Sequence, residues 1–144
     1  MMTILFQTEQ NILIITITGT CTRNGVEQAR TQSAAMCKEA GITHELIDIC
    51  EAEVHFSTLE IFEFITSFAD VFPRHTKHAV IFSPTTFDSE KSRFAETVAN
   101  NHGIIMKMFT DLDEAIRWLT NTDSTVHQSL GRTRTRAVPG QRWE

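Results

Sequence analysis

Short apolar runs alternate with amphipathic stretches along most of this chain, and this alternation restricts its fold more than any other feature. The runs are rich in β-branched residues, which favour buried strands. They cover residues 4–6, 12–18, 46–50, 79–82 and 104–109. Polar Glu9–Asn11 between the first two runs predicts a hairpin, so the first strand should be an antiparallel edge strand. Helical stretches separate the later runs, which should therefore be parallel neighbours.

Four stretches have the residue spacing of amphipathic helices. The first begins after a cap at Thr22 or Asn24 and the second after a cap at Ser57 or Thr58. The third begins near Phe87, and Thr110 caps the fourth. Gly41 ends the first helix, and Glu60, three residues after Ser57, is typical of a capping box. The second helix should continue to Phe72, before Pro73. The order ββαβαβαβα predicts an α/β fold with a mixed, largely parallel five-stranded sheet flanked by four helices.

The periodic pattern stops near residue 120, so we expect one domain over residues 1–120 and a polar C-terminal tail over 121–144. Three cysteines, without a Cys-x-x-Cys pair, favour a reducing compartment. The N-terminus lacks the pattern of a signal peptide, and the apolar run 12–17 is too short to span a bilayer. Together these features predict a cytoplasmic protein without a membrane span.

Charge is unevenly distributed in this chain of net charge −5. No lysine or arginine occurs between Lys38 and Arg74, an interval that is strongly acidic. An acidic body repels nucleic acid, so we expect no nucleic-acid partner. The simplest interpretation of the interval is a solvated acidic face. An alternative is a clasp in which an arginine-containing tail docks on this region. The residues of this clasp would be Arg132, Arg134, Arg136, Glu51, Glu53, Glu60 and Glu63.

The second half of the chain resembles a known family. The resemblance lies in Arg93-Phe94-Ala95-Glu96 through Asn101-His102-Gly103, in Met108-Phe109-Thr110-Asp111 and in Glu114-Ala115-Ile116-Arg117-Trp118-Leu119. With the hairpin start, the Leu46-Ile47-Asp48 strand and the phenylalanine-rich second helix, residues 3–120 resemble the SpoIIAA-like group of STAS domains. This resemblance implies a small mixed sheet flanked by helices, and a non-enzymatic regulatory module that associates with a protein partner.

Members of that group carry a phosphorylatable serine at the start of the second helix, in an Asp-Ser-Ser-Gly-like turn. The corresponding stretch here is His55–Leu59, which keeps a hydroxyl pair but lacks the preceding Asp and the following Gly. Ser57 and Thr58 are therefore candidates for a phosphorylation or anion site, because backbone N–H groups are free at a helix N-terminus. The alternative role is a plain N-cap.

The second helix is apolar on more than one face, which predicts that it is fully buried or shared with a partner. Its aromatic and aliphatic residues are candidates for a homodimer face or for the lining of an apolar pocket. They are Phe56, Phe62, Phe64, Ile65, Phe68 and Phe72. We expect a homodimer. The alternative is a pocket for a lipid, acyl or isoprenoid ligand, in keeping with the overlap between the SpoIIAA-like and Sec14-type lipid-binding folds.

The sequence contains no motif that predicts catalysis, a cofactor or a metal. It has no Gly-x-Ser-x-Gly elbow and no glycine-rich phosphate loop. His75 and His78 lack a nearby Cys or Glu motif, so they are a weak zinc signature. Asp48, expected at the end of a strand, is a single carboxylate and no mechanism follows from it. We therefore expect no enzyme activity, no cofactor and no metal.

Overall fold

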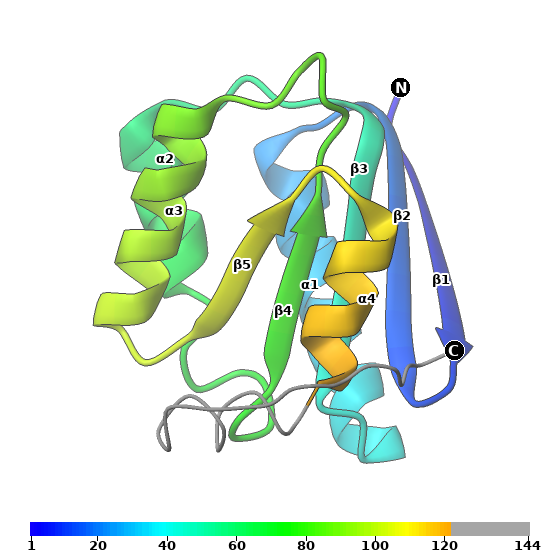
Figure 1. The fold of residues 1–144 in the computed structure, drawn as a ribbon. Helices are drawn as coiled ribbons and strands as arrows, with labels where there is room; N and C mark the ends of the chain where they lie inside the picture. The colour runs from blue at the N-terminus through cyan, green and yellow to red at the C-terminus, as the bar shows by residue number, and fades with distance from the viewer. Residues whose placement is uncertain (122–144) are drawn as a thin grey trace.

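The computed structural model describes residues 1–121 (Figure 1). Its strands are β1 (Thr3–Glu9), β2 (Ile12–Thr20), β3 (His44–Glu53), β4 (Lys77–Ile81) and β5 (Ile105–Phe109). Its helices are α1 (Arg23–Ala40), α2 (Thr58–Thr66), α3 (Ser89–Asn101) and α4 (Leu112–Thr120). The predicted order ββαβαβαβα and the α/β fold class are confirmed for these residues.

The sheet has the order β1-β2-β3-β4-β5, so each strand pairs with its neighbours in the sequence. β1 and β2 are antiparallel, and the remaining pairs are parallel. The hairpin turns at Gln10 and Asn11, whose φ angles of 53° and 65° match the two-residue turns that suit strand twist. The parallel register places Glu45 of β3 directly opposite His78 of β4.

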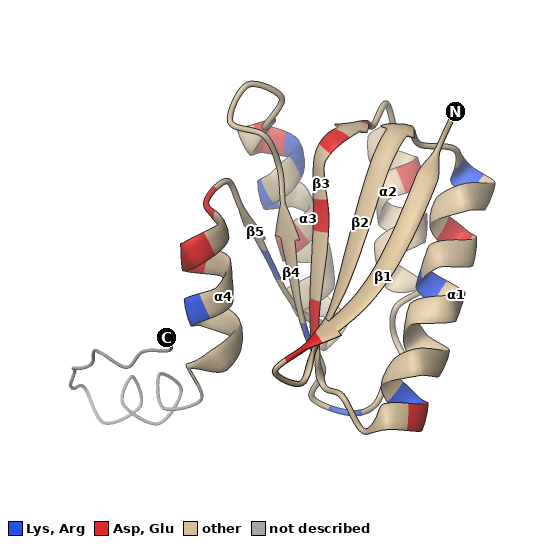
Figure 2. Ribbon diagram, turned by 90° about the vertical axis from the view of Figure 1, so that its right-hand side faces the viewer, with Lys and Arg blue, Asp and Glu red and all other residues tan. Residues whose placement is uncertain are grey.

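Helices cover both faces of the sheet. α1, α2 and α3 form one layer and α4 alone covers the other face (Figure 1), and Figure 2 shows α1 and α4 on opposite sides. Because side chains alternate along a strand, Ile47 packs into the core with the first layer while its neighbour Leu46 packs with α4. No helix within residues 1–121 is long and apolar enough to cross a membrane.

The helix ends follow from side-chain capping. The Thr22 side chain accepts a hydrogen bond from the Gly25 N–H at the start of α1, and Gly41, at φ 69°, ends that helix. The predicted cap at Thr110 is wrong. Asp111 caps α4 instead, because its carboxylate accepts hydrogen bonds from two backbone N–H groups and is favoured by the helix dipole.

The second helix is shorter than predicted, since α2 ends at Thr66. From Ser67 to Ala69, each N–H bonds to the carbonyl three residues earlier, which is a tighter winding than an α-helix. Asp70 then takes a left-handed conformation with φ 72°. The chain therefore turns at this point and buries Phe68 and Phe72 in the core.

Candidate functional site

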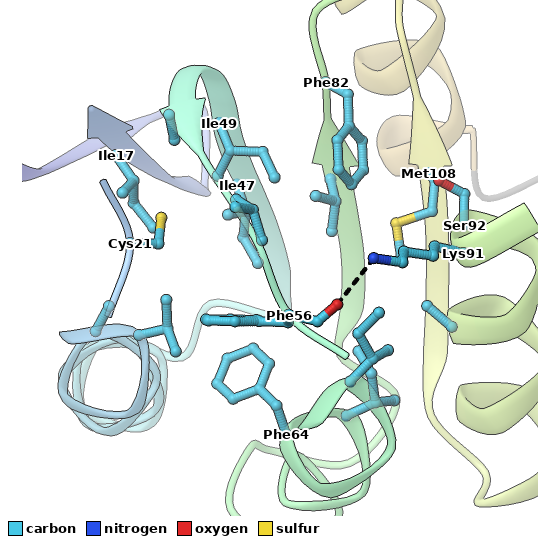
Figure 3. A pocket seen from close by; sticks show the side chains of 18 of the residues that line it. Ile17, Cys21, Ile47, Ile49, Phe56, Phe64, Phe82, Lys91, Ser92 and Met108 are labelled. Carbon is cyan, nitrogen blue, oxygen red and sulfur yellow. Dashed lines mark hydrogen bonds between the residues drawn. The ribbon is translucent and has the colours of Figure 1, made fainter. Parts of the chain in front are cut away.

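An apolar cavity of about 570 Å³ lies between the sheet and the layer of three helices (Figure 3). Isoleucines of β2 and β3 form much of its floor, and α1, α2 and α3 supply its walls. Its apolar lining includes Ile15, Ile17, Ile47, Ile49, Val26, Ile61, Phe64, Ile65, Phe68, Val80, Met106 and Met108. Small side chains at Ala29, Ala52 and Ala95 face the same space and leave it unfilled.

The exposed lining residues locate the opening of the cavity near the carboxyl ends of β3 and β4. They are Glu53, Val54, His55, Thr86, Asp88 and Lys91. Lys91 of α3 donates a hydrogen bond from Nζ to the Phe56 carbonyl oxygen over 3.0 Å, which ties the segment before α2 to α3. In Figure 3 the Phe56 ring reaches across the cavity above Phe64. Phe56 thus lines the cavity next to His55, one of the exposed residues at the opening.

Arg30 of α1 is a charged group in the wall of this largely apolar cavity. Its Nη1 donates to Ser67 Oγ over 2.5 Å, and that hydroxyl donates to the Phe64 carbonyl. The guanidinium carbon lies 5.8 Å from the Phe64 ring centroid. Its Nε is buried and has no hydrogen-bond partner among the described residues. Within this part of the chain Arg30 also has no carboxylate partner.

A buried polar network joins α1, β3 and β4 beside the cavity. Ser33 donates to one carboxylate oxygen of Glu45, and His78 Nδ1 lies 2.5 Å from the other. All three side chains are almost completely buried, with Glu45 only 1% exposed. The Phe68 and Phe72 rings each pack against His78 in a T-shaped arrangement, at centroid distances of 5.1 Å and 4.6 Å. This network holds the helix against the two central strands.

Sequence reasoning missed this network because it assigned Glu45 to a solvated acidic face. One signal was available. Glu45 is two residues from Ile47 in a buried strand, so the two side chains share a face and Glu45 points inward. His78, considered as a weak zinc ligand, is instead the partner of Glu45. The described residues contain no group of three His, Cys, Asp or Glu side chains arranged for a metal.

The cysteines lie in environments that disfavour the thiolate. Burial, and secondly the charge of Glu45, raises the pKa of the Cys37 thiol to about 12. Burial is also the main cause that raises the pKa of Cys50 to about 11 and the pKa of Cys21 above its ordinary value. None of them is an activated nucleophile.

The candidate residues of the second helix have different positions. Phe56, Phe64, Ile65 and Phe68 line the cavity, whereas Phe72 does not and packs in the core. Phe62 is 41% exposed and Leu59, one turn earlier, is 64% exposed. The helix thus has one face toward the cavity and one apolar face toward solvent. Asp48 lies inside β3 and does not end it, because this strand continues to Glu53.

Ser57 is the N-cap of α2. Its Oγ accepts a hydrogen bond from the Glu60 N–H over 3.1 Å, and Glu60 Oε1 accepts one from the Ser57 N–H over 2.9 Å. The predicted capping box is confirmed. Thr58 is the first residue of the helix, and both hydroxyl-bearing residues are exposed. Their phosphorylation stays a prediction.

The acidic side chains of the predicted clasp mostly have partners within the domain. Glu60 belongs to the capping box, Glu63 pairs with Arg23 over 2.8 Å, and Glu53 accepts from the Thr20 hydroxyl. Glu51 is exposed. The arginines of the clasp, Arg132, Arg134 and Arg136, lie outside the described residues. The clasp therefore stays a prediction.

No protein-family model matches the chain, and no curated protein sequence matches it significantly. Solved structures do. An anti-sigma factor antagonist from Mycobacterium paratuberculosis is 11% identical, with a TM-score of 0.58 over 83% of this chain and 94% of that one. An uncharacterized DUF3478 protein with a SpoIIAA-like fold, from Shewanella loihica, is 19% identical, with a TM-score of 0.51 over 82% and 93%.

A third similar structure is the anti-sigma factor antagonist SpoIIAA in its unphosphorylated form. It is 15% identical to this chain, with a TM-score of 0.51 over 83% of this chain and 97% of that one. All three similarities extend over most of both chains, so they concern the whole arrangement of sheet and helices. The described residues form a domain with the SpoIIAA-like fold of STAS domains.

Proposed function

We propose that this protein is a non-enzymatic module that binds a small, largely apolar ligand in the cavity between the sheet and α1, α2 and α3. The single observation that carries the proposal is the unfilled apolar volume of about 570 Å³. Ligand pockets commonly measure roughly 300–1,000 Å³ and are lined mainly by apolar and aromatic side chains.

Packing energetics support this interpretation of the cavity. Protein interiors are close-packed, and side chains that border a void lose dispersion contacts on that side. An occupant of matching shape restores those contacts. Met106 and Met108 line the space with flexible, polarisable side chains that adapt to ligands of different shape. The hydrogen bond from Lys91 to the Phe56 carbonyl oxygen ties the segment before α2 to α3 beside the opening.

The test compares two alanine-to-leucine variants of α1, one at a position that lines the cavity and one at a position that does not. Ala29 lines the cavity and Ala34 does not, although both are buried. Ala29→Leu should occupy part of the cavity, preserve stability and weaken binding of the neutral fluorescent dye N-phenylnaphthylamine. Ala34→Leu should overpack the core, cost about 1–3 kcal/mol and leave dye binding intact in the folded fraction. Absence of dye binding by the unaltered protein, or unchanged binding in Ala29→Leu, would refute the proposal.

A second function is association with a protein, including another copy of this chain, through the outer face of α2. Leu59 and Phe62 lie one turn apart on this helix and are both exposed. Two of the similar structures are anti-sigma factor antagonists, which supports a regulatory association module. Light scattering should find a dimer at micromolar concentration that Leu59→Lys with Phe62→Lys converts to a monomer. A monomeric unaltered protein would rule out the homodimer.

We place either function in the cytoplasm and in residues 1–120, with the tail separate from the binding domain. Cys21, Cys37 and Cys50 are all free, which supports a reducing compartment. Fractionation of the native cells tests the location. A truncated chain ending at residue 121 should keep the urea midpoint and the dye affinity of the full chain, and a large loss of either would contradict this division.

A further inference from the structure

We propose that the ligand is an apolar chain that ends in a carboxylate, as in a medium- or long-chain fatty acid, and that Arg30 binds this carboxylate. This inference rests on the proposed function and adds the chemical class of the ligand. Arg30 combines two properties that are rarely found together: it lines an apolar cavity, and its buried Nε has no partner among the described residues. A buried donor without an acceptor is unfavourable, and a ligand anion would supply the missing acceptor.

The guanidinium is held in a fixed orientation. Ser67 Oγ accepts from Nη1, and the Phe64 ring lies beside the guanidinium carbon at 5.8 Å. Nη1 is the one guanidinium nitrogen with a hydrogen-bond partner within residues 1–121. The opposite edge, formed by Nε and Nη2, therefore has no hydrogen-bond partner in this part of the chain. Two parallel N–H groups of arginine match the two oxygens of a carboxylate, which favours a planar anion of this kind.

The buried carboxylate of the cavity lining is not the partner of Arg30. Glu45 also lines the cavity, but its two oxygens are already hydrogen-bonded to Ser33 and His78. By contrast, Arg23, on the same helix two turns earlier, has both Glu27 and Glu63 as partners and does not line the cavity. The helix thus carries one arginine satisfied by protein carboxylates and one that lacks such a partner.

Lys91 is the other cation in the lining, and it fits a different position. It is exposed at the opening and donates to a backbone carbonyl oxygen. An anion bound there would remain in contact with water and would leave the Arg30 donor unsatisfied. We therefore assign the carboxylate to Arg30, with the hydrocarbon chain along the isoleucines and phenylalanines of the cavity.

The experiment measures how tightly dodecanoate and dodecanol displace the neutral dye from the delipidated full chain. The two compounds have the same chain length, but dodecanoate ends in a carboxylate and dodecanol in a neutral hydroxyl. We expect dodecanoate to bind more tightly than dodecanol. Arg30→Gln should weaken dodecanoate about 10- to 100-fold, the range expected for loss of a charge-assisted hydrogen-bonded contact, and should change dodecanol less than about twofold. The control Arg23→Gln should leave both affinities unchanged.

Each contrary outcome points to a different error. Equal affinity of the two compounds for the unaltered protein, or an unchanged dodecanoate affinity in Arg30→Gln, would overturn the assignment of the carboxylate while leaving an apolar site. A selective loss in Lys91→Gln with none in Arg30→Gln would overturn the role of Arg30. Failure of the dye, dodecanol and dodecanoate to bind the folded protein would refute the proposed function itself. Retained dodecanol binding shows that Arg30→Gln is folded.

Discussion

Removal of the Glu45 carboxylate should destabilise the domain strongly, because two buried groups depend on it. In Glu45→Ala, the Ser33 hydroxyl and His78 Nδ1 each lose an ionised acceptor. A hydrogen bond to a charged group contributes about 1.5–3 kcal/mol, so the two together amount to about 3–6 kcal/mol. Breaking a buried charged pair has a similar cost of about 3–5 kcal/mol.

The lower end of this range applies here. Glu45 borders the cavity, and water that enters at the vacated position can meet part of the lost hydrogen bonding. We therefore expect a loss of about 3 kcal/mol in the free energy of unfolding, a large part of the roughly 5–15 kcal/mol that a domain has in total. For a domain of this length the melting temperature should fall by about 10 °C.

Urea unfolding followed by circular dichroism measures this loss, with an unchanged m-value as the check that both states remain comparable. Glu45→Gln is the matched control, because it keeps the shape and one acceptor oxygen and removes only the charge. Its loss should be about half as large. In Ser33→Ala with Glu45→Ala, the second substitution should add little to the first, since both remove one network. A loss under about 1 kcal/mol in Glu45→Ala would show that the network does not stabilise the fold.

Three further predictions concern stability. Gly19→Ala should lower the free energy of unfolding in urea by about 1–3 kcal/mol, because at φ 87° its Cβ would lie 1.7 Å from the Met1 carbonyl oxygen. Gly41→Ala, also at positive φ but in open space, should cost less, and equal losses would contradict this reasoning. Because the raised pKa of the Cys37 thiol lets the folded state retain its proton, the free energy of unfolding should fall as the pH rises above 9.0, the ordinary thiol pKa. An equally steep fall in a Cys37→Ala variant would contradict this. Ser57→Ala should lose about 1 kcal/mol and Ser57→Asp almost none, because aspartate also caps helices; equal losses would argue against the cap.

Local chemistry explains why much of the fold was predictable. Strands such as 12–18 consist mainly of β-branched residues, and helix ends such as Thr22, Gly41 and Ser57 are residue types suited to those positions. The end of α2 was not predictable from these rules. Phe68 and Phe72 continue the helical spacing in the sequence, yet the backbone turns after Thr66 and buries both rings by another route.

The candidate site was less predictable, because it depends on distances between elements. The phenylalanines indicated either a pocket or an association surface, but an unfilled volume depends on how far the helices stand from the sheet. Glu45 and His78 lie far apart in sequence and meet only through the register of two parallel strands. Arg30 has no motif in its neighbourhood, and its missing partner is visible only once Ser67 and Phe64 are placed beside it.

Methyl NMR spectra of the isoleucine-labelled protein, recorded during titration with dodecanoate, test ligand binding in the cavity most directly. Isoleucines lie on both faces of the sheet, so the protein contains its own control. The methyl groups of Ile15, Ile17, Ile47, Ile49, Ile61 and Ile65 line the cavity, and those of Ile12, Ile14, Ile81 and Ile116 belong to the core under α4. We predict large, saturable shifts in the first group and small ones in the second. No shifts, or shifts mainly in the group under α4, would contradict a ligand site between the sheet and the three helices.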